Sequence, residues 1–216
     1  AQGVITGFGS VFVNGVEYFV GNNTSINMDG TDKPESDLQV GMLVTVQGTV
    51  NADGKIGMAK SIHYADLMEG VVTANSVGTN GTGTLTVMGQ TVTVTADTIF
   101  DSKVAGITSP NLIQIGNIVE VSGYASSTGD VTATRIEVKA ASQAAGTVIE
   151  VKGIISNLDT TNSTFTLGGL TVDYSGLTSA NLPSTPLADG QYVEVKSTTL
   201  FDGTGSLVAN NIEQED

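Results

Sequence analysis

The densest group of residues with chemical potential is an acidic loop near residue 30. Four carboxylates stand within nine residues, at Asp29, Asp32, Glu35 and Asp37. Calcium takes about six to eight oxygen ligands, and an acidic loop that contains glycine can wrap such a cation. The loop is therefore a candidate calcium site. It lacks the ligand spacing of an EF-hand, so the alternative is a solvated loop in which Asp37 caps a helical turn.

The chain contains one histidine, His63, and no cysteine. A single imidazole without thiolate ligands cannot complete a zinc site. A Ser-His-Asp triad would require this residue. Its strand parity is opposite to that of Ile62, however, so we expect its side chain to face solvent or a neighbouring module. We expect no catalysis at His63.

Carboxylates can also act in pairs, as in glycoside hydrolases, where two acids lie about 5 to 10 Å apart in a cleft. The chain has 22 acidic residues, but none stands in an apolar context that would indicate a raised pKa. The glycine-rich stretch 78–83 lies inside a β region and is not a phosphate-binding loop. A carboxylate-dependent enzyme is the weakest of our hypotheses, and we expect a non-catalytic protein without a cofactor.

Two aromatic residues near the N-terminus are candidate ligand contacts. Phe8 and Phe12 share the parity of one expected strand. Aromatic rings on an open barrel face can stack on sugars or bases. The alternative is that both rings fill the core of a small β unit or pack against its neighbour.

Composition narrows the class of partner. The net charge is −14, from 22 acidic and 8 basic residues. Nucleic-acid binding requires clustered Lys and Arg, so it is disfavoured. No apolar run approaches the roughly 18 to 20 residues that cross a bilayer as a helix. The chain starts at Ala1 without Met, which fits the mature end of an exported protein. We therefore expect an exported protein that is found outside the cell or at its surface.

These side chains must be positioned by a repeated framework. One marker is a glycine followed by an alternating apolar strand, and a second is Ala-x-x-Ile. The first marker occurs at 41–46, 116–121 and 190–195, and the second at 59–62, 133–136 and 209–212. Two markers with a common period of about 75 residues indicate three copies of one module.

We place the copies at 1–66, 67–145 and 146–216, with an Ala-rich linker at 139–146. Because the first boundary is short, we expect the first two copies to be held rigidly. The Ala-rich linker predicts a looser attachment of the third.

The pattern within each copy is typical of antiparallel β structure. After each marker glycine, two valines share one parity, and residues such as Glu120, Ser122 and Glu194 share the other. Period-two alternation predicts that the valines are buried and that the polar residues face solvent. In the first copy we expect strands at about 3–13, 16–20, 24–28, 42–50 and 56–64.

A longer stretch separates the third and fourth strands of each copy and ends at the marker glycine. We expect Asp37 or Asn111 to cap a short helical turn there, and the glycine to end it in a left-handed conformation. Three strands, a helical turn and two strands are the order of an OB-type barrel. The predicted fold is therefore all-β, with three tandem OB-like five-stranded barrels.

The pattern also resembles an uncharacterised bacterial family of exported, often tandem β modules. The first copy matches it best, at Gly3, Ile5, Asn14, Gly15, Tyr18, Val20, Asp37, Leu38, Val40, Gly41, Val44, Val46, Gly48, Ala59 and Ile62. The third copy departs from it, with Ser197 where the first has Gly48. The resemblance implies an exported OB-like module in the periplasm, at the surface or outside the cell of a bacterium, and it supplies no catalytic residues.

The sequence thus favours a non-catalytic, exported structural or assembly module, whose partner is another protein or a second copy at the cell surface. Repeated β units can build extended structures, since each unit contacts only its neighbours. The alternative is a ligand-binding module that holds an oligosaccharide or peptide on an aromatic-lined barrel face.

Overall fold

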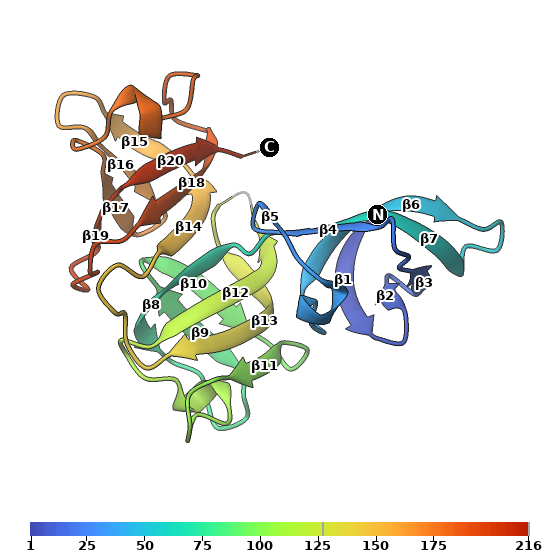
Figure 1. The fold of residues 1–216 in the computed structure, drawn as a ribbon. Coiled ribbons are helices and arrows are strands. Elements are labelled where there is room, and N and C mark those ends of the chain that lie inside the picture. Colours follow the sequence, from blue (N-terminus) through green and yellow to red (C-terminus); the bar gives the residue numbers. More distant parts are fainter. Residues whose placement is uncertain (127, 216) are drawn as a thin grey trace.

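The computed structural model describes residues 1–126 and 128–215 (Figure 1). Within them the regular elements are β-strands and three short 3-10 helices, as the all-β prediction requires. The first repeat contains β1 (Gln2–Gly7), β2 (Val11–Val13), β3 (Val16–Phe19), β4 (Ser25–Met28), β5 (Thr31–Asp32), η1 (Glu35–Asp37), β6 (Leu43–Val50) and β7 (Ile56–Tyr64). The second contains β8 (Met68–Asn75), β9 (Gly83–Val87), β10 (Gln90–Val94), β11 (Ile99–Ser102), η2 (Pro110–Leu112), β12 (Ile118–Ala125) and β13 (Val131–Ala140). The third contains β14 (Ile149–Ile154), β15 (Ser156–Asp159), β16 (Thr164–Leu167), β17 (Leu170–Asp173), η3 (Ser179–Asn181), β18 (Tyr192–Ser197), β19 (Ser206–Val208) and β20 (Asn211–Gln214).

The first repeat closes into a five-stranded barrel. Its strands pair in the order β3-β2-β1-β6-β7, and the parallel pair β3–β7 completes the ring. β4 also lies parallel to β7. The expected strand 3–13 is wrong in one respect: a turn at 8–10 divides it into β1 and β2, which pair with each other. Gly9, with φ of 123°, provides the reversal, since few other residues adopt this conformation.

The second repeat has the same circuit of pairings, β8-β9-β10-β13-β12, and β12 returns to β8. The third is divided between two sheets. In the first two repeats a register shift occurs at Gly48 and Gly123, where a Cβ atom would overlap a carbonyl of the paired strand. At the equivalent Ser197 the strand ends, and its Oγ donates to the Val208 carbonyl at 2.6 Å.

The buried faces follow the predicted alternation. Six valines are buried: Val44, Val46, Val119, Val121, Val193 and Val195. The marker glycines 41, 116 and 190 have φ between 88° and 94°, as expected for a left-handed turn. Each donates its N–H to a carbonyl in or directly after the first strand of its repeat, at 2.8 to 2.9 Å. The expected caps are wrong, because Asp37 is the last residue of η1 and Asn111 lies inside η2.

The second and third repeats form a continuous structure. β14 pairs with β8, so one sheet runs from the second repeat into the third (Figure 1). Their buried side chains form one hydrophobic cluster, whereas the first repeat has its own. The expectation of a loosely attached third repeat is therefore wrong. The Ala-rich linker does not act as a tether, since its first two residues, 139–140, end β13.

In the part of the chain that the structure describes, no helix has the length and hydropathy needed to cross a bilayer.

Candidate functional site

A row of carboxylates crosses the sheet shared by the second and third repeats. Strand register aligns them on β11, β13, β12, β8 and β14. In order they are Asp101, Glu137, Glu120, Glu69 and Glu150, and Lys196 of β18 follows. Like charges directly opposite each other on paired strands are destabilising. The row therefore requires compensating cations.

Five of the chain's eight Lys and Arg residues supply this charge. Every ion pair within residues 1–126 and 128–215 involves one of them: Lys103, Arg135, Lys139, Lys152 or Lys196. Near one end of the row, Arg135 Nη2 lies 3.0 Å from Asp101 and 3.4 Å from Glu137. Lys103 reaches Glu137 at 2.8 Å, so this end of the row is well neutralised.

The cations toward the third repeat are shared among several carboxylates. Lys196 Nζ lies 2.8 Å from Glu194 and 3.8 Å from Glu150. Lys152 Nζ lies 3.2 Å from the same Glu194. Lys139 Nζ lies 2.6 Å from Glu120, in the middle of the row. Among the described residues, Glu69 between Glu120 and Glu150 forms no ion pair.

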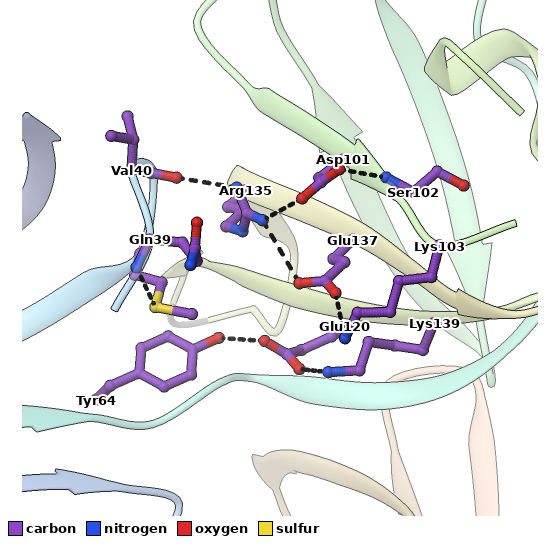
Figure 2. Close-up of polar contacts among 11 residues, drawn as sticks. Gln39, Val40, Tyr64, Asp101, Ser102, Lys103, Glu120, Arg135, Glu137 and Lys139 are labelled. Atoms are coloured by element: carbon purple, nitrogen blue, oxygen red, sulfur yellow. Dashed lines mark hydrogen bonds and ion pairs between the residues drawn. The ribbon is translucent and has the colours of Figure 1, made fainter. Parts of the chain in front are cut away.

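The first repeat covers this charged face. Tyr64 Oη donates to Glu120 Oε1 at 2.9 Å, and Arg135 Nη1 donates to the Val40 carbonyl at 3.1 Å (Figure 2). The Leu43 N–H donates to Ser122 Oγ at 2.8 Å. Glu120 is consequently only 9% exposed.

The prediction that Glu120, Ser122 and Glu194 face solvent is therefore wrong, because all three are buried. They have the expected strand parity. For Glu120 and Ser122, the polar face of the strand is the surface on which the first repeat docks.

Asp66 lies where the first repeat meets the second and third, and it is 2% exposed. Its N–H donates to Asp29 Oδ1 at 3.0 Å, and its carbonyl accepts from Lys152 Nζ at 2.9 Å. Its Oδ1 atom accepts no hydrogen bond from the residues that the structure describes. Lys152 Nζ is 3.8 Å from this oxygen, beyond hydrogen-bonding distance.

Asp66 belongs to two groups of carboxylates whose oxygens lie within 4.8 Å of one another. The first group comprises Asp29, Asp66 and Glu150, and the second comprises Asp66, Glu69 and Glu120. These five residues, the junction cluster, come from all three repeats. A third group of this kind, at the end of the last repeat, comprises Glu194, Glu213 and Glu215.

The carboxylates of the junction cluster and Glu137, near the other end of the row, differ in the direction of their pKa shifts. Burial raises the pKa of Asp66 well above its usual range, and the nearby Asp29 carboxylate raises it further. Burial is also the main cause of the raised pKa values of Asp29, Glu69 and Glu150. Burial opposes ionisation of Glu137 as well, but the hydrogen bond from Lys103 and the nearby cations lower its pKa. Negative charge is thus poorly compensated in the junction cluster.

Two clefts border the junction cluster. One, of about 670 Å³, lies between the first and second repeats, and Asp29, Glu69 and Glu120 line it. The other, of about 910 Å³, is lined by residues of all three repeats, including Asp66 and Lys152. Four members of the cluster therefore line a cleft.

The structure separates the four residues of the predicted calcium loop. Asp29 joins the junction cluster. Asp32 lies on β5, and Glu35 and Asp37 lie on η1, all exposed to solvent. Within the described residues, none of these three belongs to a group of three or more close ligands.

The predicted aromatic pair is also divided. Phe8 lies in the turn after β1 and is 44% exposed, whereas Phe12 is half-buried on β2. Phe8 lines a shallow hollow of about 390 Å³ with Glu35 and Leu38. The prediction that Phe8 and Phe12 lie on one face of the same strand is wrong, because the turn at 8–10 separates the two residues. His63 is exposed on β7 and lines the larger cleft.

Sequence reasoning missed Asp66, Glu69, Glu120 and Glu150 as a group. One signal was available: the parity positions occupied by Thr45 and Gln47 in the first repeat hold charged residues in the third. A repeat that carries charges at such positions presents a face suited to another repeat. The sequence did not indicate which repeat covers it.

Comparison with known families identifies three segments of the chain. The family described as "Domain of unknown function (DUF5666)" matches residues 2–63, 69–137 and 152–213, which together cover most of the chain. The ends of the three matches, at residues 63, 137 and 213, are 74 and 76 residues apart, in agreement with the period of the two markers. The comparisons find no similar curated protein and no similar solved structure.

Proposed function

This chain belongs to the DUF5666 family, and from that membership and its geometry we propose that it is a non-catalytic structural or assembly module. The proposal includes an OB-like fold for each repeat. Its support is the order of three strands, a 3-10 helix and two strands that close a five-stranded barrel in the first repeat. The wider proposal is that the protein works at a bacterial surface or in the periplasm, after export.

The observation that carries the proposal is the use of the charged groups to join repeats. Tyr64 and Glu120, Val40 and Arg135, and the Asp66 carbonyl and Lys152 are hydrogen-bonded pairs from different repeats. These hydrogen bonds between repeats fix the angles at which the repeats meet. A fixed arrangement is useful to a spacer or scaffold, which must hold its ends at a defined separation.

A partner surface is available on the far side of the first repeat. Phe19 of β3 pairs with Met58 of β7, and both are exposed. Ile56, two residues earlier on β7, is also exposed on the same face. Adjacent exposed apolar side chains of this kind mark contact surfaces. We assign this surface to a protein partner or to a second copy of the chain.

Solution scattering tests the structural role. A rigid three-repeat unit should give one scattering curve, calculable from the arrangement in Figure 1, that is independent of salt up to about 0.5 M because the junction is buried. A curve that requires repeats moving independently would refute the proposal.

Electron microscopy at high protein concentration then tests for assembly. A monomer at every concentration, with no partner at Phe19 and Met58, would limit the role to an intramolecular spacer.

A ligand-binding role is the second candidate, and one feature favours it. The cleft of about 910 Å³ is lined by Tyr124 and Tyr192 together with Ile154. Aromatic side chains beside polar groups suit an oligosaccharide or a peptide. A glycan or peptide array, with Tyr124→Ala as the negative control, tests this role. Binding that is lost in this variant supports it, and an array without hits removes it.

A further inference from the structure

The junction cluster carries more negative charge than its neighbours neutralise. It holds five carboxylates, and among the described residues only Lys139, Lys152 and Lys196 lie within ion-pair distance of any of them. Lys139 is bound to Glu120 at 2.6 Å. The other two lysines approach the carboxylate oxygens of the cluster only at 3.8 Å, and both lie closer to the carboxylate of Glu194. Asp29 and Glu69 form no ion pair within the described part of the chain.

The second observation is the unpartnered oxygen at the centre. Asp66 is 2% exposed, and its Oδ1 lacks a hydrogen-bond donor among the described residues. This carboxylate is shared by both ligand groups, so its oxygens lie within 4.8 Å of an oxygen of Asp29, Glu69, Glu120 and Glu150. A buried charged group is stable only when it is paired, hydrogen-bonded or bound to a metal ion.

No lysine among the described residues donates a hydrogen bond to Asp66 Oδ1. The ammonium group of Lys152 donates to the Asp66 carbonyl at 2.9 Å and lies 3.2 Å from Glu194. It therefore lies on the backbone side of Asp66, and its distance of 3.8 Å from Oδ1 is too long for a hydrogen bond. The other carboxylates of the two groups have no proton donor to offer when ionised. Either a bound cation or a proton on Asp66 that is shared with Glu150 would supply the missing partner.

We propose that the junction cluster is a calcium-binding site centred on Asp66, with Asp29 and Glu150 as principal ligands and Glu69 and Glu120 beside them. All five groups are carboxylates, which suits a hard cation rather than zinc or copper. Five carboxylates from different strands offer many oxygens in an irregular arrangement. Calcium accepts this, whereas magnesium demands near-ideal octahedral geometry and retains its water.

The site would join all three repeats. Asp29 and Asp66 come from the first repeat, Glu69 and Glu120 from the second, and Glu150 from the third. The two clefts that border the cluster give an ion a route from solvent. This site differs from the loop predicted from sequence, which shares only Asp29 with it. It also goes beyond the structural role, because a rigid spacer need not bind a metal.

Calorimetric titration of the full chain, treated with a chelator and then dialysed, tests the proposal. Calcium chloride should bind saturably with one ion per chain, and magnesium chloride should bind at least about ten-fold more weakly. Asp66→Asn and Glu150→Gln keep the size of each side chain and should each weaken calcium binding by at least about ten-fold. Circular dichroism establishes that each variant is folded.

Matched controls come from the other acidic groups. The first control is Asp37→Asn, in the acidic loop predicted from the sequence to bind calcium, and the second is Glu213→Gln, in the third group of close carboxylates. Both should leave the dissociation constant for calcium within about two-fold of the wild-type value, since surface substitutions remote from a site have small effects. Loss of binding in either control, with Asp66→Asn unaffected, would overturn the assignment.

Terbium luminescence locates the ion even if a cluster variant fails to fold. The chain has no tryptophan, and Tyr64 is hydrogen-bonded to Glu120 within the cluster. Terbium, a calcium substitute, should emit when tyrosine is excited, and Tyr64→Phe should remove most of that emission while leaving calcium affinity within about three-fold. Emission unchanged by Tyr64→Phe, or no calcium binding at millimolar concentration, would refute the proposal.

Discussion

Replacement of Arg135 by methionine should strongly destabilise the protein. The Arg135 side chain is 6% exposed and contacts Glu137, which is 8% exposed, and the Val40 carbonyl of the first repeat. Its other ion-pair partner, Asp101, is 58% exposed, so that pair contributes at most about 1 kcal/mol. Methionine has a similar length and apolar stem but no charge, so it leaves Glu137 and the carbonyl of Val40 without this partner.

The magnitude follows from the buried partners. Breaking a buried ion pair by removing one member costs about 3 to 5 kcal/mol. Lys103 remains 2.8 Å from Glu137 and recovers part of this cost. The lost hydrogen bond to the Val40 carbonyl adds about 1 kcal/mol. We expect Arg135→Met to lower the free energy of unfolding by about 3 kcal/mol in total.

Urea unfolding followed by circular dichroism measures this change. With a slope of about 2 to 3 kcal/mol per molar urea, the midpoint should fall by about 1 M. Lys60→Met is the matched control, since Lys60 is exposed on β7 and should change stability by less than about 0.5 kcal/mol. The double variant Arg135→Met, Glu137→Leu should recover part of the loss, because both charges are removed together. A loss below about 1 kcal/mol for Arg135→Met would refute the reasoning.

In a chelator, the midpoint of urea unfolding should rise as the pH falls from about 7 to about 5: the pKa values of Asp66 and Glu150 are raised in the folded state, so folding takes up protons there. A midpoint that falls throughout this range would contradict the cluster's charge imbalance. Gly123→Ala should cost about 1 to 3 kcal/mol in urea unfolding, because its Cβ would overlap the Thr132 carbonyl, whereas Gly176→Ala, which has open space, should be nearly neutral; equal effects would contradict the account. Phe165→Ala should cost about 3 to 5 kcal/mol, since this buried ring packs 5.7 Å from Tyr174, and a loss below about 1 kcal/mol would show that the ring is not in the core.

Much of each repeat could be predicted from local pattern. Alternation after each marker glycine identified the buried valines, because a strand places every second side chain on one face. The Asn14-Gly15 pair does form the turn between β2 and β3, with positive φ at both residues. Such features depend on a few neighbouring residues, and a single sequence contains them.

The arrangement of the repeats could not be predicted in the same way. Whether Glu120 faces water or another repeat depends on a surface distant in sequence, and its strand parity is the same in both cases. The sheet pairing of β14 with β8 likewise joins segments separated by the rest of the second repeat. The Ala-rich linker suggested mobility, but the strand that follows it is fixed by this pairing and by the shared core.

The candidate site was missed for a related reason. Asp29 was singled out for its acidic neighbours in sequence, whereas its neighbours in space are Asp66 and Glu150. Sequence clustering and spatial clustering agree only when a loop folds back on itself. In this chain Asp32 lies on β5, and its exposed side chain is outside the cluster.

Distance measurement between the outer repeats tests the central claim most directly, namely that the charged junction holds the first repeat rigidly against the continuous second and third repeats. The chain has no cysteine, so Lys60→Cys and Thr160→Cys, both at exposed positions, permit a single pair of spin labels on the first and third repeats. We predict one narrow distance distribution, which broadens when Arg135→Met is added. A broad distribution in the otherwise unaltered chain would contradict the account.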